Sequence, residues 1–101
     1  MRKLLLLFFI MQSLIFAAQA PLKKVVLQLQ WKYQYQFAGF IVAKELGFYK
    51  NVGLDVEIRE YQNNSVLKEL EQKKVDYAIS NADIAYCGDR LRDVTLLATY
   101  F

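Results

Sequence analysis

The sequence predicts an α/β fold in which helices cover a parallel β-sheet and the elements follow one another in βαβαβαβ order. Segments with alternating apolar residues are separated by segments whose apolar residues recur every three or four positions. The connections are short and contain glycines or residues that cap helices. Strands and helices that alternate in this way form right-handed βαβ units, so we expect neighbouring strands to be parallel.

Residues 1–20 are predicted to be a helical secretory signal peptide. Arg2 and Lys3 form a basic start, and residues 4–18 are apolar apart from two positions. This run of about 15 residues is shorter than the ~20 residues that span a bilayer. We therefore expect a periplasmic or otherwise exported protein that meets the membrane only through this leader.

The end of the leader has two interpretations. The small-x-small pattern AQA at residues 18–20 is typical of a cleavage site, and it assigns residues 21–101 to the folded domain. Pro21 follows directly and is expected to hinder signal peptidase. An uncleaved signal anchor is therefore the alternative.

The first predicted strand covers residues 24–30 and turns the side chains of Val25, Leu27, Leu29 and Trp31 to one face. A helix should follow from about residue 36, with an inner stripe of Ala38, Ile41, Val42, Leu46 and Tyr49. Gly47 suits a left-handed helix end, and residues 54–58 alternate as a second strand.

Later elements are predicted in the same way. Asn64 or Ser65 should cap a helix whose inner stripe is Val66, Leu67 and Leu70, with Glu69 pairing with Lys73. Residues 75–80 read as a third strand, and the capping box from Ser80 to Asp83 should open a third helix. Residues 94–101 read as a fourth strand. Since such a sheet usually has more strands, we expect the N-terminal part of a longer protein, or a truncated copy of one.

Composition excludes several classes of function. Without Arg2 and Lys3, 11 basic side chains face 10 acidic ones, and a net charge of +1 does not favour nucleic-acid binding. The chain has no His and one cysteine, Cys87, so these residues build no catalytic triad, zinc site or internal disulfide. Its four glycines are scattered and form no phosphate loop. We expect no catalytic residues, no metal and no cofactor.

Ligands of open α/β sheets bind beyond the carboxyl ends of the strands. Three predicted strands end in aromatic, amide or hydroxyl residues that can stack on a planar ring or read its edge. The helix starts that follow the second and third strands could also hold an acidic group. The candidate ligand-binding residues are Trp31, Gln34, Tyr35, Gln36, Phe37, Asn64, Ser65, Ser80 and Asn81.

Several of these candidates also have a structural explanation. Trp31 continues the inner face of the first strand and is as well explained as core. Asn64 and Ser65 are common turn and cap residues, and the capping box accounts for Ser80. Asn81 has no such explanation. The prediction of a pocket therefore depends on convergence at one edge of the sheet.

The stretch LQLQWKYQYQFAGFIVAKELGFYKNVGLDVEI, residues 27–58, resembles the opening of the thiamine-precursor and alkanesulfonate solute-binding family. These are periplasmic type II binding proteins related to fungal thiamine pyrimidine synthase. The most specific part is GFYKNVGLDVEI, and VDYAIS at residues 75–80 resembles the third strand of the family. The resemblance implies that residues 21–101 are the first part of lobe one, and that the candidate residues contact a pyrimidine or similar solute.

The leading hypothesis is an exported solute-binding domain that captures a small planar molecule, thiamine-precursor-like or sulfonate-like, for an ABC permease. The alternative is the ligand-sensing domain of a membrane histidine kinase or diguanylate cyclase, which would pass ligand binding to a signalling module. Thiamine pyrimidine synthase is the least expected function. The fungal enzyme uses a His and a cysteine-rich motif, whereas this chain has no His and carries Phe37 where many relatives have one.

Overall fold

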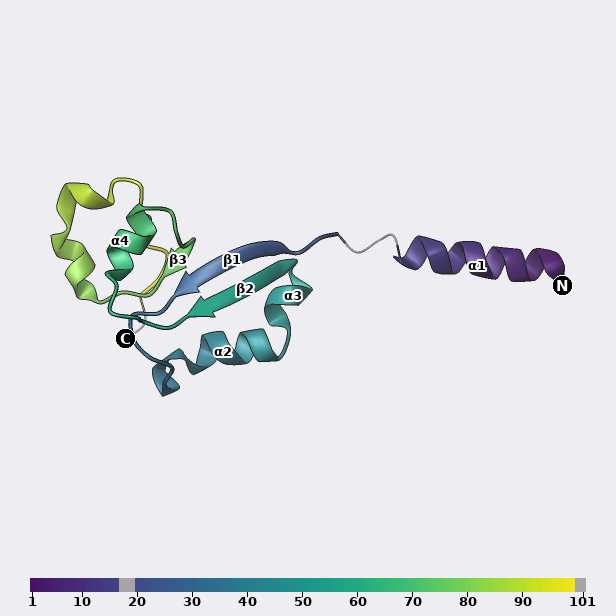
Figure 1. Cartoon of the computed structure of the whole chain (residues 1–101), viewed down its shortest axis with the longest axis horizontal. Coiled ribbons are helices and arrows are strands. Elements are labelled where there is room, and N and C mark those ends of the chain that lie inside the picture. Colours follow the sequence, from purple (N-terminus) through teal and green to yellow (C-terminus); the bar gives the residue numbers. More distant parts are fainter. Residues whose placement is uncertain (17–19, 100–101) are drawn as a thin grey trace.

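The computed structural model describes residues 1–16 and 20–99. Its sheet has three parallel strands in the order β2-β1-β3: β1 is Lys23–Gln28, β2 is Leu54–Arg59 and β3 is Tyr77–Ala78 (Figure 1). The predicted α/β class and the parallel pairing are confirmed.

Helices connect the strands. The α-helices are α1 (Arg2–Phe16), α2 (Ala38–Glu45), α3 (Phe48–Asn51) and α4 (Val66–Glu71), and the 3-10 helices are η1 (Tyr35–Phe37), η2 (Ala82–Tyr86) and η3 (Gly88–Leu91). The connection from β1 to β2 and the one from β2 to β3 run in opposite directions across the sheet. Right-handed crossovers then place α2 and α3 on one side and α4 on the other, as Figure 1 shows.

The segment predicted to be a signal peptide is helical where it is described, as α1. Among the described residues, no helix is both long and apolar enough to cross a bilayer. Most of the predicted cleavage pattern at residues 18–20 lies outside the described residues. Cleavage and export therefore stay predictions.

The core lies between the β1–β2 pair and the segment that follows β1. Six residue pairs align the two strands, from Lys23 with Leu54 to Gln28 with Arg59. The buried side chains are Val25, Leu27, Leu29, Phe37, Val56 and Ile58, and Phe40, Ile41 and Tyr49 pack against them. Burial of alternate strand residues on one face confirms the predicted alternation of both strands.

The prediction of which residues form the inner stripe of the helix after β1 is partly wrong. Ile41 and Tyr49 pack against the core as predicted, whereas Val42 and Leu46 are exposed. The inner face of the helix differs from the predicted one because η1 precedes α2. Phe37 and Phe40, three residues apart, pack toward the sheet. Gly47 has the predicted left-handed conformation, with φ of 77° between α2 and α3.

Ser65, the second of the two predicted caps, begins α4, and its side chain accepts a hydrogen bond from the backbone N–H of Lys68 at 3.4 Å. The predicted pair of Glu69 with Lys73 is wrong, because Glu69 pairs with Lys74 at 3.7 Å. Lys73 has a φ of 54°, so it belongs to the turn and no longer to the helix.

The third strand is shorter than the predicted residues 75–80. β3 pairs two residues with β1, and the side chain of Asp76 accepts a hydrogen bond from the Val26 N–H at 2.8 Å where the ladder would otherwise continue. The backbone N–H of Ile79 donates to Gln28 O at 2.9 Å. A carboxylate thus replaces one backbone partner at the start of the strand.

Two predictions for the last quarter of the chain are wrong. The segment after β3 forms the 3-10 helix η2, which Asn81 precedes without a side-chain cap, so Ser80 lies one position too early for a capping box. Residues 94–99 form no strand, although residues 100–101 lie outside the described part. Leu96 and Leu97 are exposed, and a strand needs a neighbour to satisfy its backbone.

Candidate functional site

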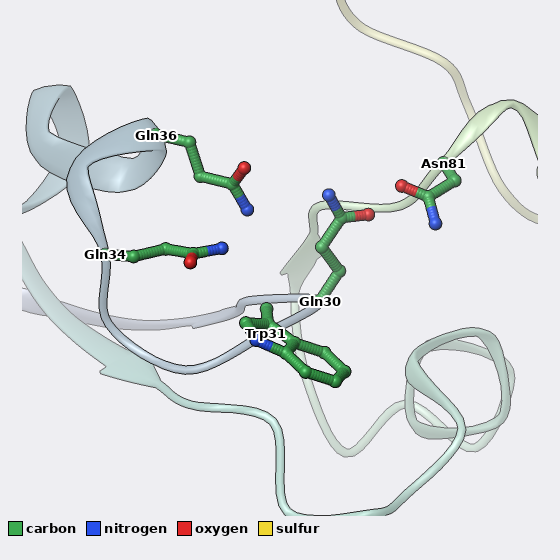
Figure 2. Close-up of a pocket in the computed structure, with 5 residues that line it drawn as sticks. All are labelled: Gln30, Trp31, Gln34, Gln36 and Asn81. Carbon is green, nitrogen blue, oxygen red and sulfur yellow. The ribbon is translucent and has the colours of Figure 1, made fainter.

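A polar cleft of about 260 Å³ lies at the carboxyl end of the sheet. Its lining residues are Gln30, Trp31, Gln34, Gln36 and Asn81. Figure 2 shows the Gln34 and Gln36 side chains extending toward Gln30 from the β1–α2 connection, with Asn81 on the opposite side. The volume is just below the ~300–1,000 Å³ typical of small-molecule pockets, which suits a small solute.

Strand order explains this position. Gln30 and Trp31 follow β1, and Asn81 follows β3, its neighbour in the sheet. The connection from β1 to β2 passes over one face of the sheet, and the connection from β2 to β3 passes over the other. This change of face leaves a crevice between the ends of β1 and β3. Such a switch point is where open α/β sheets bind ligands.

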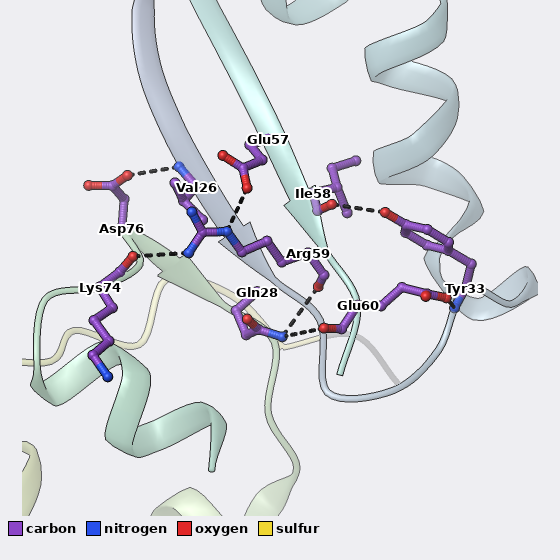
Figure 3. A network of polar contacts seen from close by, with 9 residues as sticks. All are labelled: Val26, Gln28, Tyr33, Glu57, Ile58, Arg59, Glu60, Lys74 and Asp76. Atoms are coloured by element: carbon purple, nitrogen blue, oxygen red, sulfur yellow. Dashed lines mark hydrogen bonds and ion pairs between the residues drawn. The ribbon is translucent and has the colours of Figure 1, made fainter. Parts of the chain in front are cut away.

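Hydrogen bonds join the segment that follows β1 to β2 and to the residues directly after β2. The Tyr61 N–H donates to Trp31 O at 3.2 Å, and the Tyr33 hydroxyl donates to Ile58 O at 2.9 Å. The Tyr33 N–H also donates to the Glu60 carboxylate (Figure 3). These bonds hold the cleft residues of the β1–α2 connection in place before any ligand arrives.

Gln28 strengthens this attachment from inside. The side chain is 2% exposed, and its Nε2 donates to the carbonyls of Leu29 at 3.0 Å, Arg59 at 3.3 Å and Glu60 at 3.1 Å. Figure 3 shows this amide reaching from β1 to the end of β2. A buried amide with satisfied donors fixes the spacing of the two strand ends.

Trp31 is the aromatic wall of the cleft. Its ring stacks on Tyr61, with 5.5 Å between centroids and 13° between planes. The residue is 54% exposed, so the alternative interpretation of Trp31 as core is wrong. Stacking holds the indole in one orientation while leaving more than half of the residue accessible.

The described lining of the cleft consists of four primary amides and an indole, and none of these side chains titrates. The two pKa shifts among the described residues lie on β2. The Arg59 guanidinium donates to the Glu57 carboxylate at 2.6 Å, which lowers the pKa of Glu57 and raises that of Arg59. No cluster of potential metal ligands occurs among the described residues.

The structure brings together four of the nine predicted site residues: Trp31, Gln34, Gln36 and Asn81. Tyr35 is 93% exposed and does not line the cleft, and Phe37 is a core residue that is 2% exposed. The side-chain oxygen of Asn64 accepts a hydrogen bond from the Gln62 N–H, and Ser65 caps α4. Ser80 is half-buried outside the lining.

Gln30 is a lining residue that the sequence analysis missed. Alternation assigned it to the polar face of the first strand, yet β1 ends at Gln28. Its place directly before Trp31 was the available signal. A polar residue just beyond the end of a strand belongs to the ligand-binding edge of the sheet.

A central parallel strand with a small polar crevice at its carboxyl end defines a small-molecule-binding α/β domain. The family model described as NMT1/THI5 like matches residues 34–101, more than half of the chain. The chain therefore belongs to the NMT1/THI5-like family, whose members are mostly substrate-binding proteins. No curated protein and no solved structure matches the chain significantly.

Proposed function

We propose that this chain is the ligand-capturing part of an exported solute-binding protein, which takes up a small planar molecule and delivers it to an ABC permease. The cleft at the β1–β3 switch point carries the proposal, because an aromatic wall and four amides converge there in a chain of a substrate-binding family. The helical leader, α1, supports the periplasmic location.

Two classes of ligand are compatible with the family resemblance, a thiamine-precursor-like pyrimidine and a sulfonate. Both are small enough for a cleft of about 260 Å³. The indole of Trp31 offers a face to a planar ring, and the amides offer both donors and acceptors.

The full-length protein should be screened by thermal shift against pyrimidines, sulfonates and small amino acids. A ligand of the cleft should raise the Tm as its concentration exceeds its Kd. The same ligand should change the fluorescence of Trp31, the one tryptophan of the chain, in a saturable way. Trp31→Ala should weaken binding roughly tenfold or more, because the aromatic wall is lost.

Tyr35→Ala is the matched control for this experiment. Tyr35 lies in the same connection and is 93% exposed, but it does not line the cleft. Its removal should leave the Kd unchanged. Equal losses in both variants, or a loss confined to Tyr35→Ala, would show that the ligand binds elsewhere on this connection.

Export has a separate test. In a bacterial host, the full-length chain should appear in the periplasmic fraction, and deletion of residues 2–16 should leave it in the cytoplasm. The same fractionation separates a soluble periplasmic protein from one that stays attached to the membrane through its leader. Cytoplasmic retention of the full-length chain would contradict the proposed location.

A further inference from the structure

The side chain of Gln30 has a buried acceptor that the fold does not use. Its carbonyl oxygen, Oε1, has no hydrogen-bond partner among the described residues, and Gln30 lines the cleft. Buried polar atoms in proteins are nearly always paired, since an unpaired acceptor has lost its water without compensation. An unpaired buried acceptor in a binding cleft therefore points to a partner that arrives with the ligand.

A comparison with Gln28 shows that this is specific to Gln30. The two residues have the same side chain and lie two positions apart, at the same end of β1. The Gln28 amide donates to three backbone carbonyls and holds the strand ends together. The Oε1 atom of Gln30 accepts no hydrogen bond from the described residues. The structural role therefore belongs to Gln28.

The other side chains that line the cleft favour an uncharged ligand. The other polar groups are the amides of Gln34, Gln36 and Asn81, and no Lys or Arg lines the cleft among the residues whose side chains the structure describes. A sulfonate there would be held by neutral amide and indole N–H groups alone, whereas cationic donors make the stronger hydrogen bonds to charged oxygens. The α4 N-terminus offers no substitute, since neither Asn64 nor Ser65 lines the cleft.

From these observations we propose that Gln30 is the specificity-determining residue of the cleft. Its Oε1 accepts a hydrogen bond from an N–H group on the edge of an uncharged planar ring, which lies against Trp31. The other amides read the neighbouring donors and acceptors of that edge. This inference rests on the proposed function, and it narrows the two compatible ligand classes to the uncharged heterocycle.

The test is a fluorescence titration of the full-length protein with three probes: 4-aminopyrimidine, unsubstituted pyrimidine and ethanesulfonate. Trp31 lines the cleft and is the one tryptophan of residues 1–101, so a change in its emission reports binding at this place. The amino compound should bind about tenfold or more tightly than pyrimidine, because a site built to pair with a donor rejects an analogue without it. Ethanesulfonate should give no saturable change.

Gln30→Leu removes the acceptor at similar size. In this variant 4-aminopyrimidine should lose about tenfold in affinity, pyrimidine should be unaffected, and the ratio of the two Kd values should approach one. Gln30→Glu retains an acceptor oxygen, so the preference for the amino compound should persist. Gln72→Leu is the control, since Gln72 is exposed and outside the cleft and should change neither Kd.

The outcomes separate the inference from the proposed function. An amino preference that survives Gln30→Leu would overturn the role of Gln30, while binding at Trp31 would still support a solute-binding cleft. Saturable binding of ethanesulfonate in place of the pyrimidines would likewise overturn the ligand class alone. If none of the three probes, nor any compound of the wider thermal-shift panel, binds the wild-type protein, the proposed function fails and this inference fails with it.

Discussion

The segment from β1 to β2 and the segment after β2 are held together in different ways. The first pairs six residues of β1 with six of β2 and buries Leu29 and Phe37 almost completely. In the second, β3 pairs through two residues, and Leu96 and Leu97 remain exposed. Since burial of apolar side chains is the main source of stability, the β1–β2 segment should contribute most of it.

The cleft lies on the border between these two segments. Gln30, Trp31, Gln34 and Gln36 belong to the firmly packed segment, and Asn81 comes from the other. One side of the ligand would therefore meet a wall held by hydrogen bonds from Tyr33 and Tyr61. The other side would meet Asn81, which directly precedes the 3-10 helix η2.

The largest effect is expected from truncating the core of the first segment. Leu29→Ala should lower the free energy of unfolding by about 2–5 kcal/mol, because the side chain is completely buried and leaves a cavity. Leu97→Ala, at a residue that is 72% exposed, should change it by less than about 0.5 kcal/mol. Urea unfolding measures both. Similar losses would show that the second segment is packed as firmly as the first.

A second prediction separates the two glutamines after Leu27. Gln28→Leu should destabilise the protein by about 1–3 kcal/mol, since the carbonyls of Leu29 and Glu60 lose the Gln28 donor, while the Arg59 carbonyl still accepts from the Leu29 N–H. Gln30→Leu should leave the free energy of unfolding unchanged or slightly raised, because it removes an unpaired acceptor. Thermal unfolding without ligand gives both values. A larger loss of stability for Gln30→Leu than for Gln28→Leu would show that Gln30, and not Gln28, has the structural role.

The smallest effect concerns the helix cap in the second segment. Ser65→Ala should cost about 0.5–1 kcal/mol, at the low end for a cap, since the bond to the Lys68 N–H is long at 3.4 Å. Hydrogen exchange should accelerate in α4 and stay unchanged in β1. Ser80→Ala should have no such effect, because Ser80 does not cap η2. Faster exchange in β1 would show that the two segments unfold as one unit.

Local patterns in the sequence were sufficient for much of the fold. Alternation located β1 and β2, Gly47 marked the left-handed turn, and a residue pair at the start of α4 contained the cap. These features depend on interactions within a few residues, or on one buried face whose period is visible in the chain. The same reasoning was wrong for residues 94–99, because an apolar run becomes a strand only beside a partner.

The composition of the cleft depended on the tertiary structure. The sequence alone determined that aromatic and amide residues follow the strands. Strand order then decided which of them meet. Because β1 lies between β2 and β3, the ends of β1 and β3 form the crevice. Asn64 and Ser65 follow β2 on the far side of β1, and no local pattern reveals the order of strands in a sheet.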